Sequence, residues 1–375
     1  MKVSNDYKIT KSPSKIKDTI KKMVEVSGLN QSIYLEGPSG IGKSELVAQL
    51  AKEIGAELID IRLGHYDSID LNGIGIPDLE NKKAIWTRPE IFPAENCDKK
   101  YIIFLDEFNH ATEQVFGSAY QFVLERRIGT HILPKNVLII GAGNSIDDKG
   151  ISFDMPSPLV NRFLKINVKP NTEDFLEHAF ENNIDWTITS FLKSNPDLLH
   201  KFDGTSNEDN FPTPRNWFKF DSYKSCFDDE DFVEVVANGL FGLSVMSQFK
   251  NHLSLLKKVP QVEDIFAGNG KVHTLTDLNS SYAFYMLVKV YLKNNLDKLD
   301  SDNFLNLFKY TNKQPNKEVM QMLNSEVISF VNKNSSNEFK NKFQFVIFNN
   351  QDLFKENKSF IESFSTFSKS LKQTT

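Results

Sequence analysis

The chain has 375 residues, of which 40% are hydrophobic and 25% are charged, and its formal net charge is −5. This length exceeds what one ordinary hydrophobic core needs, so we expect two or three domains. The acidic balance argues against a general nucleic-acid binder, because such proteins usually carry a basic surplus.

The first half of the chain alternates strand-like and helix-like patterns. Ser12 and Pro13 predict the N-cap and first turn of a helix that stops at Gly28. Short apolar runs then predict strands at 32–36, 57–63, 101–108, 136–144 and 163–168, with helices at 44–55 and 111–127. Strands that alternate with helices predict a parallel sheet covered on both faces. Segments 64–92 and 126–136 are long excursions from this pattern, and they predict surface loops or elements that face a pore or a partner.

The pattern becomes helical after Pro170. Helix-like stretches lie at 172–183, 184–195, 213–224, 230–246, 281–294, 302–310, 318–331 and 359–371. The last stretch places Phe360, Phe364, Phe367 and Leu371 at helical spacing. Such a stripe predicts a face docked on its own domain, or a surface for a partner or a neighbouring subunit.

Residues 37–44 read GPSGIGKS and fit the phosphate-binding P-loop pattern, with a strand before and a helix after. The predicted nucleotide-binding residues are Gly37, Pro38, Ser39, Gly40, Ile41, Gly42, Lys43 and Ser44. Glycines let the backbone N–H groups turn toward the phosphates. Lysine reaches the β and γ oxygens, and the serine hydroxyl ligates Mg²⁺. The pattern therefore predicts binding of Mg²⁺ and a nucleoside triphosphate.

Polar residues end the strands that follow. Asp106 is predicted to hold Mg²⁺ with Ser44, often through water, and Glu107 to act as the general base for the attacking water. The alternative is a pair of solvated carboxylates. Asn144 is predicted to orient that water or touch the γ-phosphate, with a turn asparagine as the alternative.

Arginine is scarce in this lysine-rich chain, so each arginine suggests a need for a planar, permanent charge. Arg162 follows a short helix-like segment, and Arg215 is expected at the second position of a helix that Thr213 caps and Pro214 begins. A cation there opposes the helix dipole and so favours an external anion, such as a triphosphate. Structural salt bridges are the alternative for both. Arg127 is expected to be a helix-end cation or an extra interface arginine.

In this order, GPSGIGKS, FLDEFN, IIGAGN, LVNRF and TPR-W resemble AAA+ ATPases, and in particular the MoxR-like branch. The resemblance covers about residues 15–245. It implies a homo-oligomeric ring, usually hexameric, with ATP between subunits. Arg162 would be an arginine finger for the neighbour's γ-phosphate and Arg215 a lid arginine. It also implies action on a protein substrate, for example one with a von Willebrand factor A domain.

We therefore expect an α/β P-loop AAA+ core with a parallel sheet (1–168), an α-helical lid (169–245) and a helical C-terminal region (246–375). The predicted function is ATP hydrolysis that remodels or activates a partner protein. The alternatives are a nucleic-acid motor or loader, a small-molecule kinase, and a structural subunit without turnover. No stretch approaches 18 uncharged apolar residues and residues 1–15 lack an apolar core. We thus expect no membrane span, no signal peptide and a cytoplasmic location.

Overall fold

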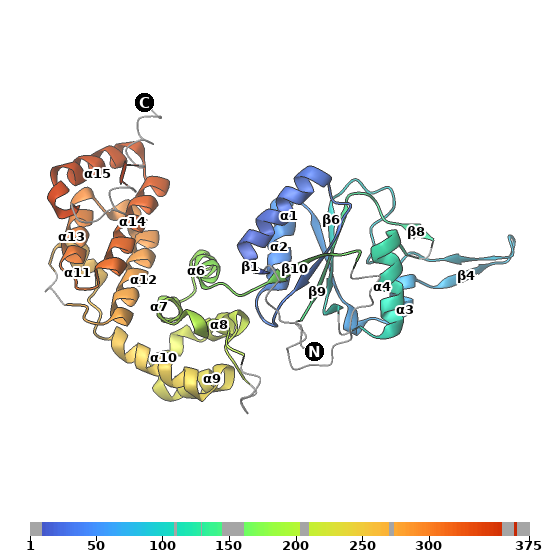
Figure 1. The fold of residues 1–375 in the computed structure, drawn as a ribbon, viewed down its shortest axis with the longest axis horizontal. Coiled ribbons are helices and arrows are strands. Elements are labelled where there is room, and N and C mark those ends of the chain that lie inside the picture. Colours follow the sequence, from blue (N-terminus) through green and yellow to red (C-terminus); the bar gives the residue numbers. More distant parts are fainter. Residues whose placement is uncertain are drawn as a thin grey trace. The chain divides into compact units, whose positions relative to one another are not determined.

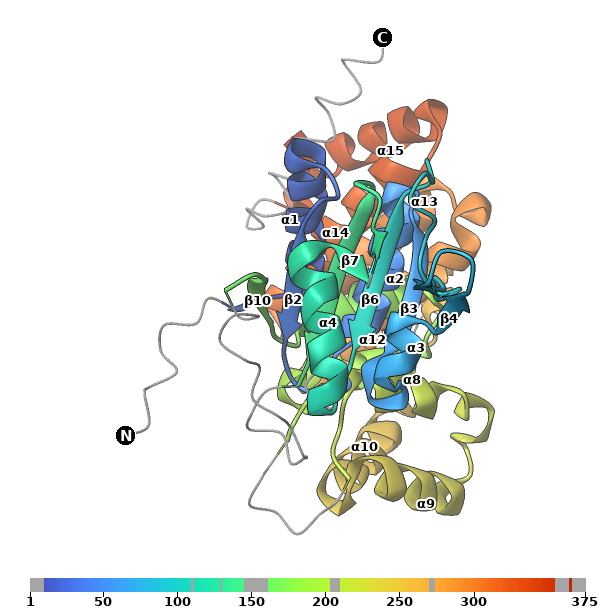
Figure 2. The same ribbon diagram turned by 90° about the vertical axis from the view of Figure 1, so that its right-hand side faces the viewer.

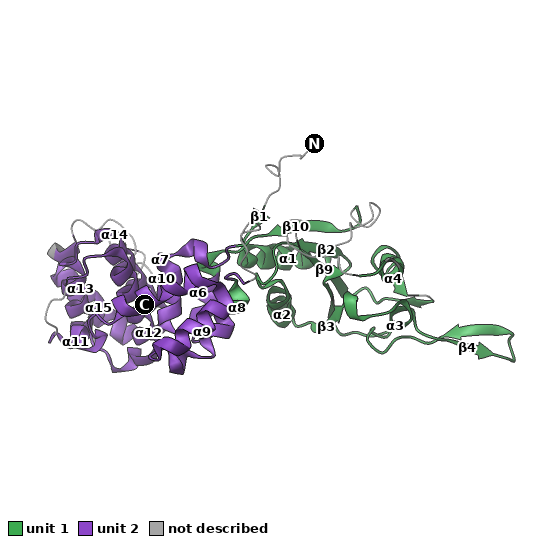
Figure 3. Ribbon diagram, turned by 90° about the horizontal axis from the view of Figure 1, so that it is seen from below, with its two compact units in different colours: residues 1–174, 202–207, 213–216 green, residues 175–201, 208–212, 217–375 purple. Residues whose placement is uncertain are grey.

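The structure is a computed structural model that describes residues 10–108, 111–128, 130–144, 161–202, 210–269, 274–354 and 364–365. It contains two compact units (Figure 3). The first comprises residues 1–174, 202–207 and 213–216, and the second comprises 175–201, 208–212 and 217–375. The division into core, lid and C-terminal region stays a prediction, and its boundary at residue 245 falls within a continuous helix, α10 (Leu243–Leu256).

A six-stranded sheet forms the centre of the first unit, and all of its neighbouring strands are parallel, as predicted. Its order is β1-β10-β2-β9-β6-β3. The strands are β1 (Thr10–Lys11), β2 (Ser32–Glu36), β3 (Glu57–Arg62), β6 (Tyr101–Asp106), β9 (Val137–Gly143) and β10 (Leu164–Val168). The short edge strand β1 was not predicted, because two residues carry no periodic signal. Figure 2 shows β6 and β3 side by side, with β2 farther along the sheet beyond β9.

Helices cover both faces of this sheet (Figure 1). One face packs on α1 (Pro13–Ser27) and α2 (Lys43–Ile54), and the other on α3 (Ser68–Asn72) and α4 (Glu113–Glu125). Side chains alternate along β2, so that Ile33 and Leu35 join the first core and Tyr34 joins the second. Each face of the sheet therefore packs against its own helical layer. Because the strands are parallel, the loops that follow them begin at the same, carboxyl edge of the sheet.

The start of α1 differs in one detail from the prediction. Pro13 is its first residue and Gly28 follows its end, as expected, but the Ser12 side chain makes no capping hydrogen bond. The backbone N–H of Ser14 donates instead to Asp174 Oδ2 at 2.8 Å. A carboxylate from a distant segment thus serves the helix end that a local serine was expected to serve.

Two antiparallel hairpins occupy the predicted excursions. The first pairs β4 (Gly75–Asp78) with β5 (Lys83–Trp86) and extends away from the sheet (Figures 1 and 3). The second pairs β7 (Arg127–Ile128) with β8 (His131–Ile132). His131 Nε2 lies 2.9 Å from the carbonyl oxygen of Trp86, so a side chain of one hairpin contacts the backbone of the other.

The second unit is helical, as predicted. Its helices are α6 (Thr172–Glu181), α7 (Trp186–Ser194), α8 (Pro214–Asp221), α9 (Glu230–Phe241), α10 (Leu243–Leu256), α11 (Val262–Ala267), α12 (Leu278–Asn295), α13 (Ser301–Asn312), α14 (Lys317–Asn334) and α15 (Asn337–Asn349). The first residues of α6 and α8 belong to the first unit. Gly242, at φ 85°, separates α9 from α10, which the sequence pattern joined. In the C-terminal stripe, Phe364 packs against the core of this unit, whereas Phe360, Phe367 and Leu371 lie outside the described residues.

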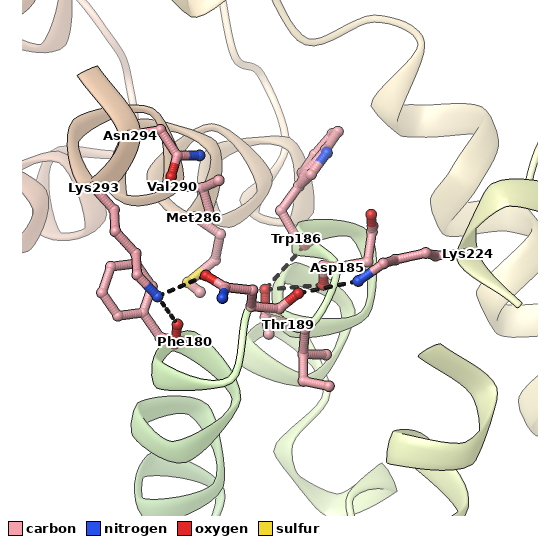
Figure 4. Close-up of a pocket in the computed structure, with 11 residues that line it drawn as sticks. Phe180, Asp185, Trp186, Thr189, Lys224, Met286, Val290, Lys293 and Asn294 are labelled. Atoms are coloured by element: carbon pink, nitrogen blue, oxygen red, sulfur yellow. Dashed lines mark hydrogen bonds between the residues drawn. The ribbon is translucent and has the colours of Figure 1, made fainter. Parts of the chain in front are cut away.

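A small pocket of about 170 Å³ lies within the second unit (Figure 4). Lys293 donates to the carbonyl oxygen of Phe180 and, at 2.8 Å, to Asn183 Oδ1. Lys224 donates to the carbonyl oxygen of Asn183 at 3.1 Å. Internal hydrogen bonds therefore engage both lysines that line the pocket. Within the described part of the chain, no helix has the length and apolar character needed to cross a membrane.

Candidate functional site: the P-loop at the carboxyl edge of the sheet

The P-loop joins the end of β2 to the start of α2. Gly40 and Gly42 have φ values of 75° and 92°, a left-handed backbone that favours glycine. A Cβ atom on Gly37 would lie 2.6 Å from the carbonyl oxygen of Val168, so a side chain there would force the loop off strand β10. The close approach at Gly37 and the left-handed backbone at Gly40 and Gly42 thus favour glycine at all three positions.

Lys43 is 8% exposed and points back into the loop. Its Nζ atom donates to the carbonyl oxygens of Gly37 and Pro38, at 2.8 and 2.9 Å, and to Asn144 Oδ1 at 3.1 Å. The Lys43 ammonium is surrounded by oxygen acceptors in a glycine-containing loop. Phosphate oxygens are stronger hydrogen-bond acceptors than carbonyl oxygens, so a bound phosphate could take the place of these carbonyls. Lys43 and Asn144 are therefore already together at the place predicted for the β and γ phosphates.

Ser44 Oγ donates to Asp106 Oδ2 at 2.8 Å. Hydroxyl and carboxylate oxygens are the hard donors that Mg²⁺ selects, usually alongside waters and phosphate oxygens. The donor set therefore fits Mg²⁺ bound together with a nucleotide. The helix that begins at Lys43 adds the positive end of its dipole to the site.

Glu107 lies directly beyond β6, which ends at Asp106 and not at residue 108 as predicted. Its φ is 53°, in the left-handed region that glutamate rarely adopts. Its backbone N–H donates to Asp106 Oδ1 at 2.9 Å. The unusual backbone ends the strand and leaves the glutamate exposed beside the Ser44–Asp106 pair. This is a position from which a carboxylate can reach a water molecule.

Arg215 is also brought to the P-loop by its backbone. Its N–H donates to the carbonyl oxygen of Gly40 at 3.2 Å. Thr213 Oγ1 accepts from the N–H of Asn216 at 3.1 Å, so Thr213 caps α8 as predicted. A Cβ atom on Gly40 would lie 2.9 Å from Thr213 Cβ. The start of α8 therefore rests directly on the loop.

The predicted arginine finger, Arg162, is exposed in a turn before β10. The short helical segment expected just before it, in residues 151–160, is outside the described residues. Arg127 forms an ion pair with Glu125, at 3.8 Å, beside the end of α4.

Two acids near the site were not predicted. Glu36, the last residue of β2, is 8% exposed and pairs with Lys165 Nζ at 2.9 Å. Asp60 lies on β3, and burial together with repulsion by the Asp106 carboxylate raises its pKa. A buried acid at the end of an apolar run is a visible signal for Glu36. Asp60 could be found only by aligning β3 with β6.

A P-loop between a strand and a helix of a parallel sheet, facing an acid at the end of a neighbouring strand, defines a P-loop nucleotide-binding protein. Residues 32–163 match the family model for the AAA domain of the dynein-related subfamily, so this part of the chain is an AAA domain of that subfamily. This confirms the predicted resemblance. Proteins with AAA domains are typically ATPases, and they generally form oligomers.

Two solved structures that the chain matches are distant in sequence. A provisionally assigned ATPase from Cytophaga hutchinsonii is 19% identical over 44% of this chain and 56% of its own, with a TM-score of 0.31. The Holliday junction branch migration motor RuvB of Thermotoga maritima is 14% identical over 78% of this chain and 86% of its own, with a TM-score of 0.37. The chain thus spans little more than half the length of the first of these.

Proposed function

We propose that this chain is a Mg²⁺-dependent ATPase that works in an oligomeric ring and acts on a partner protein. The convergence of Lys43, Ser44, Asp106 and Asn144 at one edge of the sheet supports the nucleotide half of this proposal. Residues from three strand ends meet there, separated by up to 101 positions in the chain. A glycine turn with only a structural role would not require contacts between residues from three different strand ends.

Each residue has a distinct task in this proposal. Lys43 and the loop N–H groups bind the β and γ phosphates, while Ser44 and Asp106 hold Mg²⁺, which neutralises charge on the phosphate oxygens. Glu107 takes a proton from the attacking water, and Asn144 orients that water. ATP is preferred over GTP, because the chain lacks a recognisable guanine-reading motif.

Two arginines complete the proposed site from other directions. Arg215, at the start of α8, responds to nucleotide binding through the contact of α8 with the P-loop, and it moves together with that loop. Arg162 contributes its guanidinium to the γ-phosphate bound by a neighbouring subunit, where a planar fork stabilises charge on the oxygens. Its exposure suits a residue that reaches out of its own subunit.

Replacement of Glu107 by Gln tests the hydrolysis step. The variant keeps the size and the hydrogen-bonding oxygen of the side chain but removes the base, so ATP binding is retained and turnover falls roughly a hundredfold or more. Steady-state phosphate release and calorimetric ATP binding measure both quantities. Glu90→Gln, at another exposed glutamate of the same unit, is the control and keeps normal turnover. Normal turnover in Glu107→Gln would assign the base to another residue.

The β4–β5 hairpin supports the partner half of the proposal. Its exposed apolar side chains, with exposed fractions from 43% to 85%, are Ile74, Ile76, Leu79, Ile85 and Trp86. Apolar side chains gathered on one projecting ribbon typically mark a protein-binding surface. We propose that this hairpin contacts the partner protein, for which a von Willebrand factor A domain is the first candidate.

A capture experiment tests that contact. Glu107→Gln in ATP holds the assembled state, so a bound partner is retained, and Lys43→Ala in the same buffer retains none. Adding Ile76→Ser and Ile85→Ser to Glu107→Gln removes the partner, whereas adding Val235→Ser, at an exposed valine of the helical unit, does not. Equal capture by both combinations would place partner binding elsewhere. ATP turnover stimulated by single- or double-stranded nucleic acid would instead favour the motor or loader alternative.

A further inference from the structure

Three aromatic rings pack together on the sheet face that α4 covers. They belong to Tyr34 of β2, Phe108 just after β6 and Phe163 just before β10. Their ring centroids are 6.0 Å apart for Tyr34–Phe108, 5.6 Å for Tyr34–Phe163 and 5.5 Å for Phe108–Phe163. The three side chains are only 5%, 0% and 6% exposed. This aromatic triad therefore joins segments that are far apart in the sequence.

Strand β9 leaves room for the triad at Gly141. Gly141 of β9 pairs with Tyr34, and a Cβ atom on Gly141 would lie 3.1 Å from the Tyr34 ring and 3.5 Å from the rings of Phe108 and Phe163. All three rings thus rest over the same glycine. Because such interiors are close-packed, one ring can shift only if the others follow.

The two phenylalanines are the chain neighbours of two proposed site residues. Phe108 follows Glu107, and Phe163 follows Arg162. Glu107 holds a left-handed backbone, at φ 53°, that persists only where its surroundings restrain it. The restraints on its two sides are the hydrogen bond from its N–H to Asp106 and the fully buried ring of Phe108. Arg162 is exposed, but the next side chain anchors its turn in the core.

We propose that Phe108 and Phe163 are positioning residues that couple Glu107 to Arg162 within each subunit. This inference rests on the proposed function, in which Glu107 serves the subunit's own nucleotide and Arg162 serves the neighbour's. The state of Glu107 at one ATP site then sets the position of Arg162 at the next. The edge-to-face contact between the two rings is the link between consecutive sites of the ring.

A matched pair of rings in the same core serves as the control. Phe92 and Phe122 lie 5.1 Å apart and are 4% and 3% exposed, and neither adjoins a proposed site residue. Phe163→Leu and Phe122→Leu each replace one buried phenylalanine of the same core. A merely structural role predicts equal effects of the two replacements, whereas the coupling predicts that only Phe163→Leu reaches the site.

Hydrogen exchange measures the first half of the coupling without any need for turnover. In Phe163→Leu, the peptide containing Glu107 and Phe108 exchanges roughly tenfold faster than in the wild type, because its restraint is loosened. The same peptide in Phe122→Leu exchanges as in the wild type. Unchanged exchange in Phe163→Leu, or equal acceleration in Phe122→Leu, overturns the proposal.

Mixed rings measure the second half. When Lys43→Ala is mixed with Arg162→Ala, the only complete sites pair the Glu107 of an Arg162→Ala subunit with the Arg162 of a Lys43→Ala subunit. Adding Phe163→Leu to the Arg162→Ala chain, which supplies no finger, is expected to lower this turnover roughly ten- to a hundredfold. Adding Phe108→Leu to the Lys43→Ala chain, whose own site is dead, is expected to lower it likewise.

The outcomes separate this inference from the proposed function. Recovery in the simple mixture, with no effect of either phenylalanine change or with an equal effect of Phe122→Leu, overturns the coupling and leaves the proposed function intact. No recovery in the simple mixture, while Phe163→Leu still speeds exchange at Glu107, removes the proposed action of Arg162 on its neighbour. That result would also overturn the proposed link between neighbouring ATP sites. The faster exchange would still show that Phe163 restrains the backbone at Glu107.

Discussion

Lys43 Nζ donates a hydrogen bond to Asn144 Oδ1 at 3.1 Å, although the two residues are 101 positions apart. The contact joins the P-loop to the carboxyl end of β9, the strand that lies between β2 and β6 in the sheet. Under the proposed function, a nucleotide phosphate competes with Asn144 for the lysine ammonium. This hydrogen bond then links nucleotide binding to the proposed positioning of water by Asn144.

Lys43→Ala is expected to weaken ATP binding by roughly a hundredfold or more, because charge-assisted hydrogen bonds to the phosphates are lost. The chain remains folded, since the lysine contacts loop oxygens and not the apolar core. Titration calorimetry with a non-hydrolysable ATP analogue measures the affinity. Lys52→Ala, at an exposed lysine of the same helix, is the control and binds normally. Unchanged affinity in Lys43→Ala would contradict the P-loop assignment.

Arg162→Ala is expected to bind ATP nearly normally and to hydrolyse it ~10³-fold or more slowly, in line with the usual effect of arginine fingers. Arg162→Lys does not restore the rate, because lysine lacks the bidentate fork. Turnover measured across a range of protein concentrations shows whether the active site needs a second chain. Full turnover by Arg162→Ala, independent of concentration, would indicate a site complete within one subunit.

Arg215→Ala is expected to slow turnover with little loss of stability, because the contact of α8 with Gly40 is made by the backbone and survives the change. Phosphate release and thermal unfolding measure the two effects. Lys219→Ala, later in α8, is the control. If both variants match the wild type in turnover and ATP affinity, Arg215 is a surface cation without a role at the site.

His252 makes the stability of the helical unit depend on pH. Its side chain is 3% exposed and packs on Phe191 and Phe249, and its Nε2 atom lies 2.8 Å from Ser190 Oγ. Burial lowers its pKa from 6.5 to about 4. Between these two values the unfolded chain binds the proton and the folded chain does not. Stability is therefore lost as pH falls from about 6.5 toward 4, by about 3 kcal/mol in total.

Urea unfolding followed by tryptophan fluorescence in a Trp86→Phe background reports on the helical unit, which contains Trp186 and Trp217. The difference in stability between the wild type and His252→Gln is expected to shrink as pH falls from about 6.5 toward 4. His65→Gln, at an exposed histidine of the first unit, keeps the wild-type pH dependence. A pH-independent difference for His252→Gln would show that the ring titrates normally.

The parallel sheet and the P-loop could be predicted because their signals are local. Short apolar runs predicted β2, β6 and β9. The spacing of Gly37, Gly42 and Lys43 predicted the P-loop. The bond from Ser44 to Asp106 needed only the rule that parallel strands end at a common edge. The predicted roles of Glu107, Arg162 and Arg215 in catalysis stay predictions.

Features set by tertiary contacts could not be predicted in this way. The left-handed backbone of Glu107 has no local sequence signal, since glutamate usually avoids it. The backbone N–H of Ser14, in the first turn of α1, donates to Asp174, which lies 160 positions away. Helix α15 was missed because its asparagines and phenylalanines are moderate helix formers, and packing of Phe343 and Ile347 on the core decides its conformation.

The left-handed backbone of Glu107 lowers thermal stability at a residue that the proposed hydrolysis needs. A left-handed conformation costs a side-chain-bearing residue about 1–2 kcal/mol, which glycine would not lose. Glu107→Gly is therefore expected to melt at a higher temperature than the wild type while losing hydrolysis. A screen for heat resistance alone would favour glycine at this position, and under the proposed function the variants that it returned would not hydrolyse ATP.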